Sequence, residues 1–428
     1  MLRAFRNAFK VPDLRKKILF TLFVIALYRF GSHIPLPGVD FDKVAELKEA
    51  AKQGGGVYAL INLFSGGALT NFAIFALGIM PYITSSIIMQ LLTVVIPRLE
   101  ALQKEGEVGR KKITQYTRYM TIVLALLQSL GIIVTANSGN LFQGVRDFFP
   151  NQGVGRISLV VLTLTAGTAL IMWLGELITQ RGIGNGMSIL IFSSIISGLP
   201  AQSASLWGAA GPAKGSVFIV LGILIVVAVV IVEQGQRRIP VTYAKRQVGR
   251  RTYGGSSTYI PMKVNQAGVV PIIFASSLLY LPVLASTIVS NTGFTDFVNR
   301  TFAQPSSMIY IAVYFVLILF FTYFYTAITF NPTDVADNMK KYGGFIPGIR
   351  PGRPTAEYLE HVLSRITLPG AVFIGMIAVL PGIAQAIFDI QAFPFAGTSA
   401  LIMVGVALET MKQIESQLMM RNYEGFLS

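Results

Sequence analysis

The chain has 428 residues, of which 53% are hydrophobic and only 13% are charged. Soluble proteins carry about 25% charged residues, and uncharged stretches long enough to cross a bilayer recur along this whole sequence, so we exclude a soluble fold and expect a polytopic helical membrane protein. The chain has no cysteine, which excludes disulfides and thiolate metal sites. Its net charge of +15 could reflect binding to nucleic acid, binding to acidic lipid, or the basic cytoplasmic loops of a membrane protein.

The amino-terminal segment 1–17 is basic and leads into an apolar stretch, a pattern that superficially resembles a signal peptide. The apolar part continues past Arg29 to a Pro-Leu-Pro sequence without a small-residue cleavage site. We therefore expect 1–17 to be a cytoplasmic amphipathic segment and the apolar part to be a retained first span.

An uncharged run of 45 residues follows, from Gln53 to Pro97. It is too long for one span, which needs about 20 residues, and Ser65-Gly66-Gly67 interrupts it. Irregular backbone at membrane depth is tolerated only inside protein or beside a water-filled cavity. We expect a re-entrant or interfacial segment first, and a true span from about residue 72.

Uncharged stretches predict ten membrane helices along the chain. We place them near 18–36, 72–96, 118–136, 157–176, 183–207, 215–233, 268–289, 307–330, 366–386 and 397–411. Five helices fall in an N-terminal half, 18–207, and five in a C-terminal half, 208–411, before a cytoplasmic tail at 412–428. Because each half has an odd number of membrane helices, the second half would cross the membrane in the opposite orientation to the first. Any relation between the halves would therefore be an inverted repeat around a midplane pathway.

The Lys and Arg residues are distributed unequally between the two sets of connections. Of the 35, 27 lie on the side of the amino terminus and 7 on the opposite side, while Arg29 lies within the first span. By the positive-inside rule both termini are expected in the cytoplasm.

Charged groups are almost missing from the predicted spans. Their centres contain no carboxylate, and Glu176, Glu233 and Glu409 lie at predicted ends. This pattern argues against an ion-coupled transporter and against an enzyme, which both need such groups at depth. Arg29 is the exception, and we expect it to snorkel or to pair structurally. The glycine-rich sequence from Arg181 to Gly186 follows a membrane helix rather than a strand, which predicts a tight turn rather than a phosphate-binding loop.

Two cytoplasmic loops, 233–267 and 331–365, are longer than topology requires. The first carries seven basic residues and no acidic residue between Gly235 and Lys263, and its alternating pattern with a "YGG" turn predicts a basic hairpin. We interpret it as a docking site for phosphates or an acidic protein, in preference to a topological anchor on anionic lipid. In the second loop, interleaved Gly and Pro predict a rigid presentation of Arg350 and Arg353, again a docking site rather than a connector.

Long motifs in both halves resemble the SecY family, the channel subunits of bacterial protein translocons, over essentially the whole chain. They are "SGGALTNFAIFALGIMPYITSSIIMQLL", "KEGEVGRKKITQYTRY", "MWLGELITQRGIGNGMSILIF", "YAKRQVGRRTYGG", "KVNQAGVVPIIFASS" and "YGGFIPGIRPGRPTAEYLE". The resemblance implies an all-α membrane protein with ten transmembrane helices in two inverted five-helix halves. These would surround a central hourglass pore with a short re-entrant plug helix at about 57–71.

The resemblance also implies a function and a set of site residues. Unfolded preproteins would cross the pore and hydrophobic segments would leave sideways into lipid, without catalysis or a cofactor. A constriction ring would be formed by Ile79, Ile83, Ile191, Ile273 and Ile402, with Met187 at a neighbouring position. The plug would include Leu60, Ile61, Leu63, Phe64, Ser65, Gly66 and Gly67. The lateral gate, between helices 2 and 3 and helices 7 and 8, would include Gln90 and Asn265, which either hold it shut or make ordinary interhelical hydrogen bonds. The docking residues would be Arg237, Arg238, Lys245, Arg246, Arg250, Arg251, Arg350 and Arg353.

The partners that the resemblance implies are SecE and SecG in a heterotrimeric channel, the SecA ATPase, the ribosome through its RNA and proteins, preprotein signal sequences and membrane lipids. SecDF and YidC are further suggested partners. The expected location is the bacterial cytoplasmic (inner) membrane. Two other classes compete with a protein-conducting channel: an inverted-repeat secondary transporter of a small solute, and a membrane-embedded transferase. Missing intramembrane charges and missing catalytic constellations count against them.

Overall fold

The computed structural model describes residues 8–39, 65–137, 153–243, 246–248, 251–253, 257–288, 292–302, 304, 306–388 and 397–424. The described part of the N-terminal half contains α2 (Pro12–Gly31), α5 (Met80–Val95), α6 (Pro97–Lys104), α7 (Glu107–Asn137), α8 (Val154–Arg181) and the first arm of α9 (Gly186–Gln234). The C-terminal half contains the second arm of α9, α10 (Val270–Ile288), α11 (Thr292–Thr301), α12 (Met308–Thr329), α13 (Pro332–Lys341), α14 (Arg353–Phe388) and α15 (Gly397–Glu424).

The fold is mostly helical, and several helices have the length and apolarity of membrane spans. Four qualify outright among the described residues: Glu107–Val134, Val154–Arg181, Met308–Lys341 and Arg353–Ala384. A fifth candidate is the pair α5 and α6, bent by 99° at its break, and Gly186–Pro200, Ile219–Gln234 and Val270–Val283 are shorter apolar helices. A polytopic membrane protein is thus supported, while the count of ten spans and the domain boundaries stay predictions.

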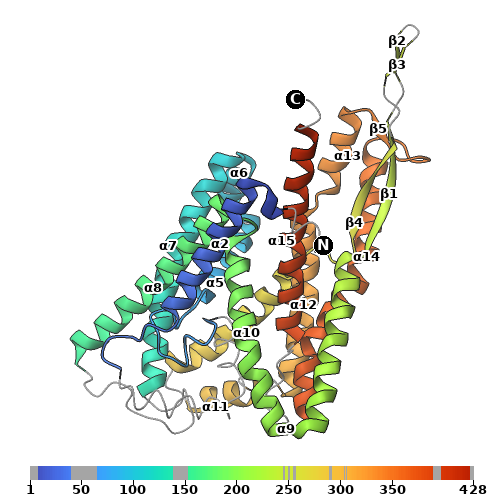
Figure 1. Cartoon of the computed structure of the whole chain (residues 1–428). Coiled ribbons are helices and arrows are strands. Elements are labelled where there is room, and N and C mark those ends of the chain that lie inside the picture. Colours follow the sequence, from blue (N-terminus) through green and yellow to red (C-terminus); the bar gives the residue numbers. More distant parts are fainter. Residues whose placement is uncertain are drawn as a thin grey trace.

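Helix α9 contains two of the predicted spans, 183–207 and 215–233, in one assigned element. Its backbone leaves the helical region at Gly211, where φ is 74° and ψ is 168°. Glycine adopts such a conformation without the steric cost that a Cβ would bring. Figure 1 shows the two arms of α9 diverging from a bend at the end of the bundle far from the sheet.

Helix α5 corrects one predicted boundary. The span expected at 72–96 begins as a helix only at Met80, and residues 66–79 form turns. Positive φ angles at Gly66, Gly67, Phe72 and Gly78 are incompatible with a continuous right-handed helix. Pro81 then lies in the first turn of α5, where its missing N–H is not needed.

Three helices extend well beyond the predicted apolar stretches. Helix α7 begins at Glu107 instead of residue 118, α14 begins at Arg353 instead of residue 366, and α15 ends at Glu424 instead of residue 411. Hydropathy detects the apolar core of a span, but a helix with polar side chains can continue into water without any change of backbone.

The expected tight turn between α8 and α9 is confirmed. Gly184 has a φ of 80°, and the side chain of Asn185 caps α9 by accepting hydrogen bonds from the backbone N–H groups of Met187 and Ser188. Gly182 and Gly186 of the motif lie so close to neighbouring atoms that a Cβ would clash, so these glycines allow close packing of the chain at this turn.

The first long loop forms the predicted hairpin. Strand β1 (Gln236–Tyr243) pairs antiparallel with β4 (Ser257–Lys263), and β2 (Arg246–Val248) pairs with β3 (Arg251–Tyr253) at the far tip (Figure 1). The second long loop contributes β5 (Gly344–Phe345), which pairs with the other edge of β1 to give the order β4-β1-β5. The two predicted docking loops are therefore one folded unit, which the sequence did not indicate.

Three apolar clusters stabilise the described structure. The largest runs through the helical bundle and includes residues of α2, α5, α7, α8, α9, α10, α12, α14 and α15. A second joins the sheet to α13 and α14, with Ile239 and Leu359 in its centre. A third packs the amino end of α2 against α15 and the α8–α9 turn through Leu14, Ile183 and Ile414.

Candidate functional site

The five candidate ring isoleucines come from four separate helices and are all buried. Ile79 is the N-cap residue just before α5 and Ile83 lies in the first turn of that helix, while Ile191 lies in the first arm of α9, Ile273 in α10 and Ile402 in α15. All five belong to the large apolar cluster of the bundle. Branched aliphatic side chains at the meeting point of helices can close a pathway to water and ions without binding any one substrate tightly.

Met187 lies at the start of α9 and packs against this cluster. Its sulfur occupies the space above Gly175 of α8, since a Cβ added at Gly175 would be 2.4 Å from the Sδ atom. A flexible thioether fills such an irregular gap well. This contact places part of the Met187 side chain between α8 and α9, so it also has a packing role.

The turns that precede α5 are attached to α2 and α9 by polar contacts. Arg29 donates a hydrogen bond from Nη1 to the Gly66 carbonyl at 2.8 Å. The hydroxyls of Tyr28 and Ser194 share a hydrogen bond of 2.8 Å, and the Tyr28 hydroxyl also donates to the Ser65 carbonyl at 3.4 Å. Of the two roles expected for Arg29, structural pairing is the one observed.

Further backbone contacts fix the same turns. Pro35 and Ala73 form an isolated antiparallel bridge, in which Leu36 donates to the Phe72 carbonyl at 2.8 Å and Ile74 donates to the Ile34 carbonyl at 2.9 Å. The ring of Phe75 stacks on that of Tyr28, with centroids 5.7 Å apart. The chain from Ser65 to α5 is thus tied closely to the end of α2.

The predicted plug residues lie only partly within the described structure. Ser65, Gly66 and Gly67 are described, and Ser65 is completely buried. Leu60, Ile61, Leu63 and Phe64 lie outside the described residues, so the plug helix itself stays a prediction.

Helices α5 and α7 meet α10 along one seam, where the resemblance places the lateral gate. Gln90 is half-buried on α5, and the structure shows no hydrogen bond from its side chain to another described residue. Asn265 is buried and donates from Nδ2 to Glu233 Oε2 at 2.7 Å and to the Gly268 carbonyl at 3.0 Å. Asn265 thus connects the end of α9 to the approach to α10, and a gate role for either residue stays a prediction.

The sheet presents basic side chains on a rigid support. Arg237 and Arg238 are exposed on β1, and the guanidinium of Arg238 lies over the ring of Tyr259 on β4, 4.8 Å from its centroid. Below them, Ile239 of the sheet packs with Met339 of α13 and Leu359 of α14. The described backbone also places Arg246 in β2 and Arg251 in β3, whereas Lys245 and Arg250 lie outside the described residues.

Arg350 and Arg353 differ in their availability. Arg353 donates from Nε to Glu357 at 3.0 Å within the first turns of α14. Arg350 is exposed and makes no ion pair with another described residue, while its carbonyl accepts a hydrogen bond from the Thr355 hydroxyl at 2.8 Å. The loop conformation is therefore fixed through the backbone, and the Arg350 side chain stays exposed.

Sequence reasoning missed several residues at these positions. Tyr28 and Ser194 gave no signal, because a tyrosine and a serine within apolar helices are unremarkable in sequence. Arg118 and Glu176 form an ion pair between α7 and α8, and only the position of Glu176 at the end of a predicted span could have drawn attention to it.

Comparison with known proteins gives one consistent family. The family model described as SecY matches residues 73–411. A curated relative from Streptomyces coelicolor, "Protein translocase subunit SecY", is 58% identical over all of this chain and all of its own.

Solved structures show the same fold at low identity. One of them is described by the statement that the plug domain of SecY stabilises the closed state of the translocation channel and maintains a membrane seal. The match covers 94% of this chain and 92% of that chain, with a TM-score of 0.66 and 16% identity. Sec61 in the canine ribosome–channel complex covers the same shares, with a TM-score of 0.59 and 16% identity.

Proposed function

The chain belongs to the SecY family, and from this premise we propose that it is a protein-conducting channel. It passes unfolded preproteins across the bacterial cytoplasmic membrane and releases hydrophobic segments sideways into lipid. The observation that carries the proposal is identity of 58% along the full length with a protein translocase subunit. No observation favours the alternative of a small-solute transporter.

The buried isoleucines support a closed pore in this proposal. Ile79, Ile83, Ile191, Ile273 and Ile402, contributed by both halves of the chain, form a ring around the translocating polypeptide. A preprotein presents every kind of side chain in turn, so specific polar contacts in the pore would trap some of them. Apolar and deformable side chains instead exclude ions while the chain slides past.

The turns from Ser65 to Phe72, most of which fall within the predicted plug, support the presence of such an element. In the proposal, the plug at about 57–71 fills the external funnel in the resting channel and leaves it when a preprotein enters. Its carboxyl end is held by Tyr28, Arg29 and Ser194. Displacement then begins on the amino-terminal side of this attachment.

The sheet and the loop that carries Arg350 act as one docking unit in this proposal. Pairing of Thr242 with Phe345 joins the hairpin to the second loop, so a partner that binds one part also moves the other. The basic side chains fit the phosphates of ribosomal RNA and acidic surfaces of the SecA motor. Sec61, a structural neighbour, was solved in a ribosome–channel complex.

The remaining elements of the proposal follow the family. The channel has ten spans in two inverted halves with both termini in the cytoplasm, and it assembles with SecE and SecG. SecA or the ribosome supplies the preprotein and the energy, signal sequences open the lateral gate, and SecDF and YidC act beside the channel.

Reconstitution tests the proposal directly. The chain is incorporated into lipid vesicles together with SecE and SecG, and SecA, ATP and a radiolabelled preprotein are added. We expect protease-protected preprotein that depends on both SecA and ATP, without accumulation of small solutes. Vesicles that accumulate a solute, or that protect no preprotein while SecA remains active on a control channel, would contradict the proposal.

A further inference from the structure

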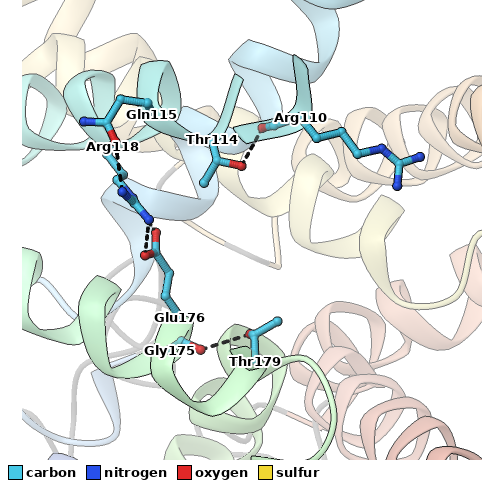
Figure 2. Close-up of polar contacts among 7 residues, drawn as sticks. All are labelled: Arg110, Thr114, Gln115, Arg118, Gly175, Glu176 and Thr179. Atoms are coloured by element: carbon cyan, nitrogen blue, oxygen red, sulfur yellow. Dashed lines mark hydrogen bonds and ion pairs between the residues drawn. The ribbon is translucent and has the colours of Figure 1, made fainter. Parts of the chain in front are cut away.

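An ion pair connects α7 and α8 within the described helical bundle. Arg118 donates from Nε to Glu176 Oε1 at 2.8 Å and from Nη2 to Oε2 at 2.5 Å (Figure 2). A third donor, Nη1, bonds to Gln115 Oε1 at 2.9 Å. This fork-to-fork geometry fixes the relative orientation of the two helices as well as their separation.

The pair is better shielded from solvent than the ion pair within α6. Arg118 is 35% exposed and Glu176 is 16% exposed, whereas Lys104 and Glu100 of α6 are 75% and 51% exposed. Exposed ion pairs contribute little because water screens them, and this screening is weaker where a side chain is partly buried. Loss of Glu176 should therefore cost more stability than loss of Glu100.

Helix α5 is attached to the same level of α7. The hydroxyl of Ser85 is buried and donates to the carbonyl of Thr117, the residue before Arg118, at 2.7 Å. Ser85 follows the candidate ring residue Ile83 by two positions. The ion pair and this hydrogen bond together connect α5, α7 and α8.

Helix α9 is attached to α8 within one turn of Glu176. Thr179 accepts a hydrogen bond from the backbone N–H of Gly186 at 2.9 Å, and its own hydroxyl donates to the Gly175 carbonyl (Figure 2). A Cβ at Gly186 would lie 1.8 Å from that carbonyl oxygen, so only glycine permits this approach. The contacts thus continue from α5 to the amino end of α9.

The seam with α10 contrasts with these contacts. The hydroxyls of Ser276 and Ser286 on α10 donate to carbonyls of their own helix. No described side chain of α10 makes a hydrogen bond to α5 or α7, although α10 packs against both helices, so fewer polar contacts oppose their separation.

We propose that Arg118 and Glu176 are positioning residues, whose ion pair holds α5, α7, α8 and the amino end of α9 as one rigid unit. Opening of the lateral exit then separates this whole unit from α10, and α7 does not move away from α8. The ring residues on α5 and α9 keep their mutual positions while the exit opens. The inference rests on the proposed function, because it concerns how that channel opens.

Spin labels measure this rigidity in the reconstituted complex. The chain has no native cysteine, so the exposed residues Tyr119 on α7 and Trp173 on α8 can be replaced by cysteine and labelled uniquely. We expect a narrow distribution of label distances, unchanged when a preprotein is trapped in the channel. R118Q and E176Q should each broaden it, and the exchange variant R118E/E176R should narrow it again.

The exposed pair on α6 provides the matched control. E100Q removes one partner of the pair with Lys104, and it should leave the label distances unchanged. The inference is overturned if R118Q and E176Q keep the narrow distribution, or if the exchange variant resembles the two single variants. Translocation by the unlabelled channel is assayed separately, so failure of the proposed function is distinguished from failure of this inference. The exchange variant keeps both charges, which guards against a result that reflects misfolding.

Discussion

Arg29 of α2 donates a hydrogen bond of 2.8 Å to the carbonyl oxygen of Gly66, 37 positions later in the chain. A charge within a span must be paired or reach water, and here the partner is a backbone group. Gly66 has a φ of 63°, and a Cβ there would lie 2.6 Å from Arg29 Nη1. The positive φ favours glycine at position 66, and Arg29 supplies the charged donor.

Replacement of Arg29 by methionine is expected to increase the ion leak of the resting channel. The variant loses a hydrogen bond to a charged group, a loss of about 1.5–3 kcal/mol, which corresponds to about 10- to 100-fold more of the detached state. Conductance of planar bilayers that contain the purified complex measures the leak. The control is R15Q on the exposed face of α2, and wild-type conductance in the methionine variant would contradict the attachment.

The Tyr28–Ser194 contact predicts coupling between two substitutions. Tyr28→Phe keeps the ring on Phe75 but loses the hydroxyl, and Ser194→Ala removes the other partner. Each should lower the free energy of unfolding by about 1 kcal/mol, and the double variant should lose clearly less than the sum. Denaturant unfolding in detergent measures this. Ser276→Ala, whose hydroxyl bonds within α10, should instead add to Tyr28→Phe, and additivity in both pairs would contradict the coupling.

The sequence predicted the apolar cores of the helices because burial in lipid demands long uncharged stretches. It did not predict the start of α7 at Glu107 or the end of α15, because polar helical extensions leave no hydropathy signal. It also missed β5, a strand of two residues paired across about 100 positions of chain. The partners of Arg29 and Arg118 could not be found either, since one is a carbonyl and the other lies 58 positions away.

The candidate ring predicts an ion leak that depends on side-chain size. Replacement of Ile79, Ile83, Ile191, Ile273 and Ile402 by glycine removes the aliphatic surface that closes the pore, so resting conductance should rise at least several-fold. Ile195 lies one turn beyond Ile191 on α9 and is equally buried. Ile195→Gly should lower the free energy of unfolding about as much as Ile191→Gly alone, but without an ion leak. Equal conductance of the ring variant and wild type would remove the ring assignment.

The docking unit predicts unequal roles for its two neighbouring arginines. Arg350 is free of ion pairs with described residues, so Arg350→Glu reverses a charge that the proposal places against the partner and should strongly reduce SecA-driven translocation. Arg353 is exposed and bonded to Glu357 within its own helix, and Arg353→Gln should have a small effect because such a pair contributes about 0–1 kcal/mol. Initial rates of preprotein protection in vesicles measure both.

Ribosome binding by the same variants should weaken as the salt concentration rises. The dependence of the affinity on salt should be shallower for Arg350→Glu than for wild type, because fewer phosphate contacts release fewer counterions. Equal rates of preprotein protection for Arg350→Glu and wild type would contradict the docking role assigned to this loop.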